Sequence, residues 1–209
     1  YPDWRINRFE GVWTDHEQGA MRHTGDVFDM AIKGKGFFAV QTPEGVQYTR
    51  NGNFSKNDQG QLVTPIGYPV LDQAGAPITI PENYQRPEID ASGTVRVRDE
   101  LIGEQTVIGQ LQIVDFPNLY DKNDAAQTPY QAPLKKGRDG LFIPHPATQQ
   151  APAENFVISQ GFLEESNVQP VLEMVKMIDI FRSYEAEQRA VQVQDSTLER
   201  AVNDLGRVS

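Results

Sequence analysis

Residues 37–50 read FFAVQTPEGVQYTR and carry the clearest fold signal in the chain. Two short runs of apolar, β-branched and aromatic residues, 37–40 and 46–50, flank a Pro-Glu-Gly turn. Proline presets the backbone for a turn, and glycine accepts positive φ, so this stretch predicts a β-hairpin. Turn signals of the same kind recur every eight to twelve residues to about residue 116, a spacing typical of a β-sandwich or barrel.

Short apolar runs separated by turn residues continue through much of the first 160 residues. Residues 94–98 alternate strictly, and residues 106–116 form a longer strand candidate. Residues 117–153 are rich in proline and polar side chains, so we expect a loop-rich region with one short strand at 141–143. We therefore predict a mainly β protein, with a sandwich-like or barrel-like domain over residues 1–160.

The chain changes character after a short junction that we place at 161–167. Glycine is absent between Gly161 and Gly206, and Pro170 stands where a first helical turn would begin. These signals predict one long α-helix over residues 168–205, about 55 Å in length at 1.5 Å per residue. The fold class is thus a mainly β domain followed by a long, coiled-coil-forming C-terminal helix.

This helix has a seam of side chains that repeats in steps of three and four residues. Eight of its ten members are apolar or aromatic, and two are polar. We predict that the seam is an assembly interface, made of Met174, Met177, Phe181, Tyr184, Gln188, Val191, Asp195, Leu198, Val202 and Leu205. A second apolar stripe of Val171, Val175 and Ile178 widens the face over the first turns. Such a seam needs a partner helix, in another chain or elsewhere in the same protein, and a core role within this chain is the alternative.

Composition excludes several functional classes. The chain has no cysteine, which removes disulfides and thiolate metal sites, and three histidines leave little for a histidine metal centre. Its 19 basic and 29 acidic residues give a net charge of −10, which is unsuited to electrostatic binding of nucleic acid. No apolar run approaches the length of a membrane span, so we expect no membrane insertion. The chain opens Tyr1-Pro2 without a signal peptide, and we expect it to be an excised or processed piece.

Catalytic motifs are weak. Gly34-Lys35-Gly36 resembles the start of a dinucleotide loop, but a strand follows it, so we expect a tight turn. Residues 121–124 lack the glycine and glutamate of a calcium loop. The carboxylate pairs Asp99-Glu100 and Glu164-Glu165 could serve a glycosidase, yet neighbouring acids are common among 29. We predict no enzyme activity, no cofactor and no metal site.

Three stretches resemble the bacterial flagellar rod and hook family, most nearly its FlgF and FlgG type rod proteins. They are residues 17–40 (EQGAMRHTGDVFDMAIKGKGFFAV), residues 48–71 (from YTRNGNF to GYPVL) and residues 161–185 (from GFLEESNV to RSYE). Their order and spacing fit, and the resemblance spans most of the chain. One departure is Val27-Phe28-Asp29, where the family usually carries Pro-Leu-Asp.

The resemblance implies a structural subunit that polymerises into a tubular drive shaft, with the last helix in an inner layer and the β domain outside it. It implies rod and hook proteins as partners, self-association through helices, a periplasmic position in the basal body, and export by the flagellar secretion apparatus. Family members begin with a long helix that this chain lacks, and its absence would leave the seam without a partner.

Two other readings stay open at this stage. A cell-wall or carbohydrate-acting β-sandwich enzyme or binding protein would show a deep cleft with two convergent carboxylates, one of them with a raised pKa. A hook or phage-baseplate-like filament component would share the assembly features but belong to a different tube.

Overall fold

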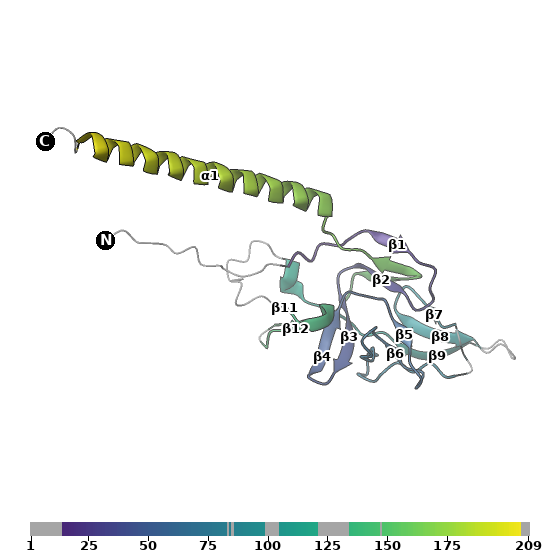
Figure 1. Ribbon diagram of the computed structural model, residues 1–209. Helices are drawn as coiled ribbons and strands as arrows, with labels where there is room; N and C mark the ends of the chain where they lie inside the picture. The colour runs from purple at the N-terminus through teal and green to yellow at the C-terminus, as the bar shows by residue number, and fades with distance from the viewer. Residues whose placement is uncertain are drawn as a thin grey trace. The chain divides into compact units, whose positions relative to one another are not determined.

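The computed structural model describes residues 14–82, 84, 86–98, 105–120, 134–146 and 148–205. The chain divides into two compact units, Tyr1–Asn167 and Val168–Ser209. The described part of the first unit is built mainly of short antiparallel strands, and the second contains one long helix (Figure 1). The prediction of a mainly β protein with a long C-terminal helix is confirmed.

The strands of the first unit are short, and every pair between them is antiparallel. They are β1 (Met21–His23), β2 (Met30–Gly34), β3 (Phe37–Thr42), β4 (Gly45–Thr49), β5 (Ser55–Lys56), β6 (Leu62–Val63), β7 (Glu88–Ile89), β8 (Thr94–Arg98), β9 (Gln105–Gln110), β10 (Ile113–Asp115), β11 (Leu134–Lys136), β12 (Phe142–Pro144), β13 (Ala151–Pro152), β14 (Phe156–Gln160) and β15 (Phe162–Glu164).

The predicted hairpin lies at the centre of the largest sheet, whose strand order is β11-β12-β4-β3-β10-β13. Thr42 pairs with Gly45 across a two-residue loop, and the Thr42 hydroxyl donates to the Gly45 carbonyl at 2.7 Å. Gly45 has a φ of 118°, a conformation that favours glycine at this turn. The turn chemistry read from the sequence therefore fixes the register of the hairpin.

β3 is buried on both faces, which explains its unbroken apolar run. Successive side chains of a strand point to opposite faces. Phe38 and Val40 accordingly join one apolar cluster, while Phe37 and Ala39 join a second cluster with Tyr48. Phe38 meets Phe54 edge to face in the first cluster, with ring centroids 5.1 Å apart. The β unit is thus built around this one strand.

The strand candidate at 106–116 is split in the structure. β9 belongs to the three-stranded sheet β7-β8-β9, and β10 belongs to the six-stranded sheet. Between them the Leu111 amide donates to the Gly93 carbonyl, and the Gln112 amide donates to the Leu71 carbonyl. The alternation in the sequence is real, but the chain changes sheets in its middle.

The region expected to be loop-rich, 117–153, contains more structure than its composition indicates. Besides β11, β12 and β13, it holds two 3-10 helices, Pro117–Tyr120 and Arg138–Gly140. β13 includes Pro152 and lies at the end of the sheet order, where a missing N–H is tolerated. Leu134 and Leu141 are buried, so these short segments contribute to the core.

The second unit contains the helix α1 (Pro170–Leu205), which has 36 residues and is therefore about 54 Å long. Pro170 occupies the first helical position, where its missing N–H costs nothing, and the Glu173 amide donates to the Gln169 carbonyl at 3.1 Å. Charged residues recur along α1, and the described part of the chain has no helix apolar enough to be a membrane span.

Candidate functional site

Two segments that are far apart in the sequence run side by side at one edge of the β unit. β1 pairs with β15, and the pairing continues outward because the Glu165 amide donates to the Ala20 carbonyl at 2.8 Å. The Asn167 side chain donates to the carbonyls of Asp15 and Glu17 at 3.4 and 3.2 Å. We call residues 14–23 and 162–167 the paired segments. The chain therefore leaves the β unit toward α1 beside the segment that leads into β1.

Gly19 allows this close approach. A Cβ atom at position 19 would collide with the backbone carbonyl of Glu165. The Gly19 amide donates to the Glu164 carboxylate at 2.9 Å. The glycine is therefore required by contact between two backbones rather than by an unusual φ.

Arg50 holds the paired segments to the rest of the β unit. Its Nε donates to the Glu164 carboxylate at 2.6 Å, in an ion pair whose side chains are 19% and 10% exposed. Its two terminal nitrogens donate to the carbonyls of Ile32, Gly34 and Gly36 at 2.5 to 3.0 Å. One guanidinium thus joins β15 to the turn between β2 and β3.

This arrangement explains the motif that resembled a dinucleotide loop. Gly34 and Gly36 have φ values of 103° and 124°, so they form the tight turn expected from the sequence. Their carbonyl oxygens point to Arg50 and accept its hydrogen bonds. The turn binds a side chain of the same protein.

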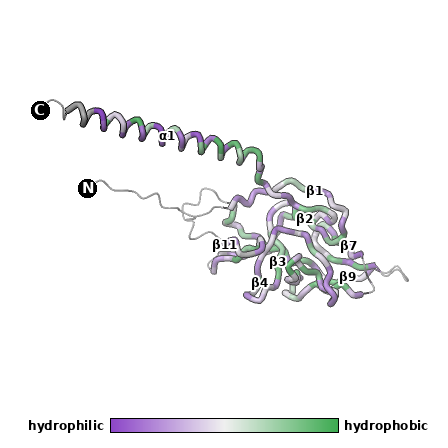
Figure 2. Tube along the Cα trace, viewed as in Figure 1, coloured by the Kyte–Doolittle hydropathy of each residue, from purple (hydrophilic) through white to green (hydrophobic). Residues whose placement is uncertain are grey.

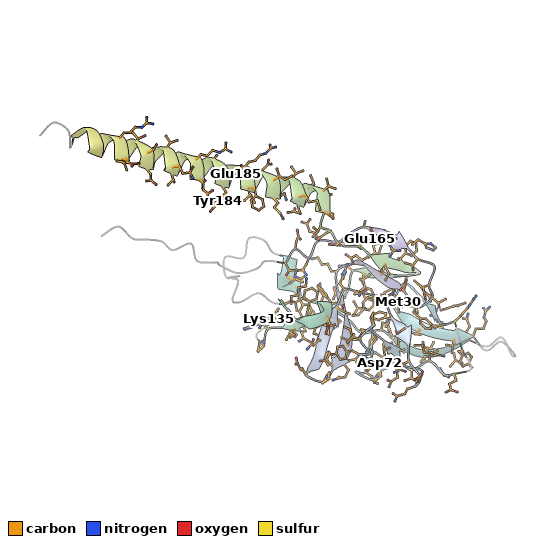
Figure 3. All side chains as sticks on the ribbon, in the orientation of Figure 1. Met30, Asp72, Lys135, Glu165, Tyr184 and Glu185 are labelled. Carbon is orange, nitrogen blue, oxygen red and sulfur yellow. The ribbon has the colours of Figure 1, made fainter. Side chains whose placement is uncertain are left out.

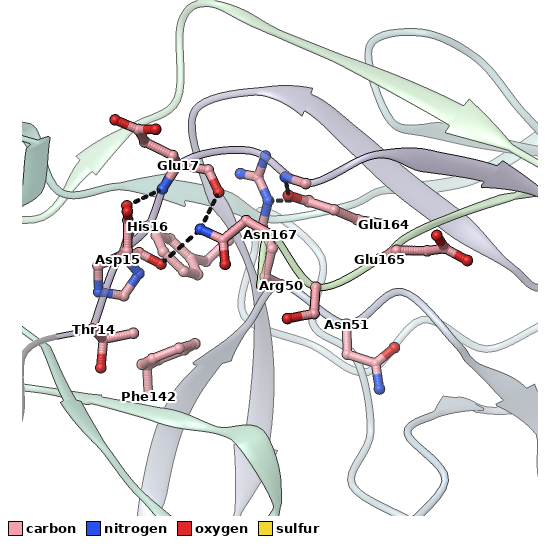
Figure 4. A pocket seen from close by; sticks show the side chains of 13 residues that line it. Thr14, Asp15, His16, Glu17, Arg50, Asn51, Phe142, Glu164, Glu165 and Asn167 are labelled. Atoms are coloured by element: carbon pink, nitrogen blue, oxygen red, sulfur yellow. Dashed lines mark hydrogen bonds and ion pairs between the residues drawn. The ribbon is translucent and has the colours of Figure 1, made fainter. Parts of the chain in front are cut away.

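A cavity of about 230 Å³ lies beside the ion pair (Figure 4). Its walls come from the paired segments, the two residues after β4, and one residue each of β3 and β12. Inside it the His16 ring meets Phe37 and Phe142 edge to face, with centroid distances of 5.9 and 5.3 Å. Burial lowers the pKa of His16 below its usual value, and Arg50 adds to that effect while Asp15 opposes it.

Two carboxylates beside the cavity, those of Glu164 and Glu165, are engaged in ion pairs. Both oxygens of the Glu164 carboxylate are occupied, one by Arg50 and the other by the Gly19 amide. Its neighbour Glu165 forms a separate, exposed ion pair with Arg22 at 3.0 Å. The two carboxylates singled out from the sequence therefore form separate ion pairs within the β unit, and Asp99-Glu100 lies outside the described residues.

The remaining titratable groups, taken over the residues that the structure describes, do not point to a reactive site. Among the described residues, no cluster of three or more histidine or acidic side chains could hold a metal ion. The pKa of Asp90 is lowered, chiefly by the hydrogen bond from the Ser92 hydroxyl, which favours an ordinary charged carboxylate in a turn. A glycosidase acid would need the opposite shift.

The predicted interface residues on α1 are exposed. Met174, Met177, Phe181, Tyr184, Val191 and Leu198 have between 56 and 63% of their surface accessible. Hydrophobic residues are concentrated in the first half of the helix (Figure 2), and Tyr184 and Glu185 project from different sides of it (Figure 3). The stripe of Val171, Val175 and Ile178 is exposed as well.

The polar members of the seam differ in what they contact. The Gln188 amide donates to the Tyr184 hydroxyl at 3.2 Å, one turn away. Asp195 is exposed. Val202 and Leu205 lie within α1, and their side chains belong to the part that the structure does not describe. Whether the ten residues form an interface stays a prediction.

Sequence reasoning missed the ion pair and its surroundings. Arg50 and Glu164 are 114 positions apart, and nothing local marks them as partners. The signal that could have found them is the position of both residues inside the stretches 48–71 and 161–185, which carry the family resemblance.

Comparison with known proteins gives the chain its family. The model of the flagellar hook protein FlgE/F/G D1 domain matches residues 31–97, and the model of the flagellar basal body rod FlgEFG protein C-terminal region matches residues 159–205. The first match begins within β2 and ends within β8, and the second contains the whole of α1.

Individual relatives agree with the family models. The flagellar basal-body rod protein FlgF of Mesorhizobium japonicum is 36% identical over 194 residues, which cover 91% of this chain and 72% of the relative. FlgF of Caulobacter vibrioides is 36% identical over 95% of this chain and 74% of its own length. FlgG of Bacillus subtilis is 33% identical over 91% of this chain and 70% of its own length. The resemblance read from the three stretches is confirmed, and the chain belongs to the family of flagellar basal-body rod proteins FlgF and FlgG.

Proposed function

We propose that this chain is a structural subunit that polymerises with other rod and hook proteins into the tubular drive shaft of the flagellum. The helix at 168–205 lies in the inner layer of the tube, and the β domain of residues 1–160 lies outside it. The segment 161–167 connects the two layers. The rod is periplasmic, and its subunits reach it through the flagellar secretion apparatus.

The observation that carries this proposal is the exposed seam of α1. Its six described apolar or aromatic members are each more than half exposed. Removing apolar surface from water contributes about 25 cal/mol per Å², so a helix that exposes a seam over most of 54 Å gains stability when other helices cover it. A shaft made of packed helices provides that cover.

The features of the β unit agree with a mechanical role. Within the β unit, Arg50 and the paired segments hold β15 to the sheet through an ion pair and backbone hydrogen bonds. The cavity beside them has its carboxylate Glu164 engaged. A structural subunit needs such anchoring and needs no catalytic group.

The test is complementation of motility in the host bacterium with the full-length protein. Phe181→Asp and Met177→Asp place charges in the seam, while Val193→Asp places the same charge on another side of α1. Seam variants should abolish swimming and leave no rod in isolated basal bodies, because a buried charge is costly without a partner. The Val193 variant should swim.

Export must be measured in the same strains. The seam variants should still be found in the periplasmic fraction, since the substitutions act on assembly. Normal swimming by both seam variants would overturn the proposed role of α1.

A further inference from the structure

The first part of α1 repeats every three residues. From Val171 the sequence runs VLE, MVK, MID, IFR and SYE, so the third position of each triplet is charged. The charged residues are Glu173, Lys176, Asp179, Arg182 and Glu185, and all five are exposed. Their signs alternate without interruption. We call these five residues the charged ridge.

A three-residue repeat does not stay on one side of an α-helix. With 3.6 residues per turn, each step of three moves about 60° around the axis, so the charged ridge winds through about 240°. Rows of residues three apart form the ridges by which helices pack. Exposed apolar residues accompany the charged ridge on both sides, among them Leu172, Val175 and Ile180. This segment therefore offers contacts in several directions, unlike a two-stranded coiled coil with one seam.

The alternation of sign makes the charged ridge complementary to itself. Because the charged ridge winds, only part of it faces any one neighbour, and when two parallel copies lie level those charges stand at the height of like charges. When one copy is displaced by three residues, about 4.5 Å along the axis, Lys176 comes level with the neighbour's Asp179, and Asp179 with the neighbour's Arg182. Within one helix, Lys176 pairs with Glu173 at 2.7 Å, so neighbouring charges of the ridge attract one another.

We propose that the charged ridge is a lateral contact between copies of this chain, and that it sets an axial displacement of an odd number of three-residue steps between neighbouring parallel helices. The proposal rests on the proposed function, since it takes the chain to be a repeating subunit. A displacement repeated in one direction never closes into a ring, so the contact produces an open helical array. The ridge adds a register to the apolar seam.

The test uses purified chain and two charge variants. Lys176→Glu with Arg182→Glu gives an all-acidic ridge, and Glu173→Lys with Asp179→Lys and Glu185→Lys gives an all-basic ridge. Each variant alone should self-associate at least about tenfold more weakly than the unmodified chain in sedimentation experiments, because like charges oppose binding. Mixing the two variants should restore association. Circular dichroism checks that α1 stays helical in both.

A matched control separates the ridge from overall charge. Lys136→Glu with Arg200→Glu makes the same charge change away from the charged ridge and should leave association within about twofold of the unmodified chain. Raising the salt concentration should weaken association, since exposed charges are screened. Equal behaviour of control and ridge variants, no restoration on mixing, or no association of the unmodified chain would overturn the proposal.

The register has its own readout, because the chain contains no cysteine. In a mixture of Leu172→Cys and Val175→Cys chains, disulfides should form between the two variants faster than within either one. Preference for like pairs would refute the displacement. If these assays fail while seam variants still abolish the rod in cells, the lateral contact through the charged ridge is refuted and the proposed function stands. If the assays succeed but the seam variants leave the rod intact, the lateral contact stands and the proposed function is refuted.

Discussion

Replacing Arg50 by methionine should destabilise the β unit strongly. Methionine keeps an unbranched apolar stem but donates no hydrogen bond. The Glu164 carboxylate loses its cation, and the carbonyls of Ile32, Gly34 and Gly36 lose a donor. The perturbation thus leaves a carboxylate that is 10% exposed without a charge partner.

The expected cost is about 3 kcal/mol. Removing one partner of a buried ion pair costs about 3–5 kcal/mol, and the lower end applies because the Arg50 side chain is 19% exposed. Glu164→Gln should cost less, about 1–2 kcal/mol, because Arg50 keeps its three carbonyl acceptors. The double variant should show a coupling of about 1–2 kcal/mol between the two positions.

The assay is urea unfolding followed by near-ultraviolet circular dichroism, which reports the packed aromatic rings of the β unit. The neighbouring pair Arg22–Glu165 is the matched control, since it lies at the same edge of the β unit but its side chains are 58 and 52% exposed. Arg22→Met should cost no more than about 1 kcal/mol, as exposed pairs usually do. Equal effects of the two arginine variants would refute the argument that burial makes Arg50 the anchor.

Three further predictions concern the same unit. Burial lowers the pKa of His16 in the folded state, so the unfolded chain binds the proton first as pH falls. The free energy of unfolding should therefore decrease below about pH 6.5. Unfolding titrations at pH 7.5 and 5.5 should show a smaller decrease in His16→Phe than in the unmodified chain. Gly19→Ala should lower the free energy of unfolding by about 1–3 kcal/mol through collision with the Glu165 carbonyl, whereas Gly109→Ala, which has ordinary contact distances, should be tolerated in the same denaturation assay. Ser92→Ala should raise the pKa of Asp90 toward its usual value, because the Ser92 hydroxyl bond is the main cause of its lowering, and a carboxyl NMR titration that finds no change would contradict this.

The parts of the fold that sequence reasoning found are those with local causes. The hairpin around Pro43-Glu44 follows from turn chemistry, and α1 follows from apolar periodicity, the absence of glycine and the position of Pro170. The turn at Gly34-Lys35-Gly36 was also anticipated, since a strand follows it.

What could not be predicted depends on tertiary contacts. The split between β9 and β10 occurs where the amides of Leu111 and Gln112 donate to the carbonyls of Gly93 and Leu71. The short strands between residues 134 and 152 have too few residues for alternation to show. Arg50 and Glu164 are 114 positions apart in the sequence, and only the folded chain brings them together.

The geometry of β1 and β15 has a consequence for load. The outer ends of the paired segments, at residues 14 and 167, lie at the same edge of the β unit. Tension between these two ends would therefore break the hydrogen bonds between the segments one at a time. Strands pulled apart in this way resist weakly, because their hydrogen bonds break one after another and do not share the load. Arg50 connects Glu164 of β15 to the turn between β2 and β3, so a force applied at this edge would load the Arg50 hydrogen bonds before it reached the core.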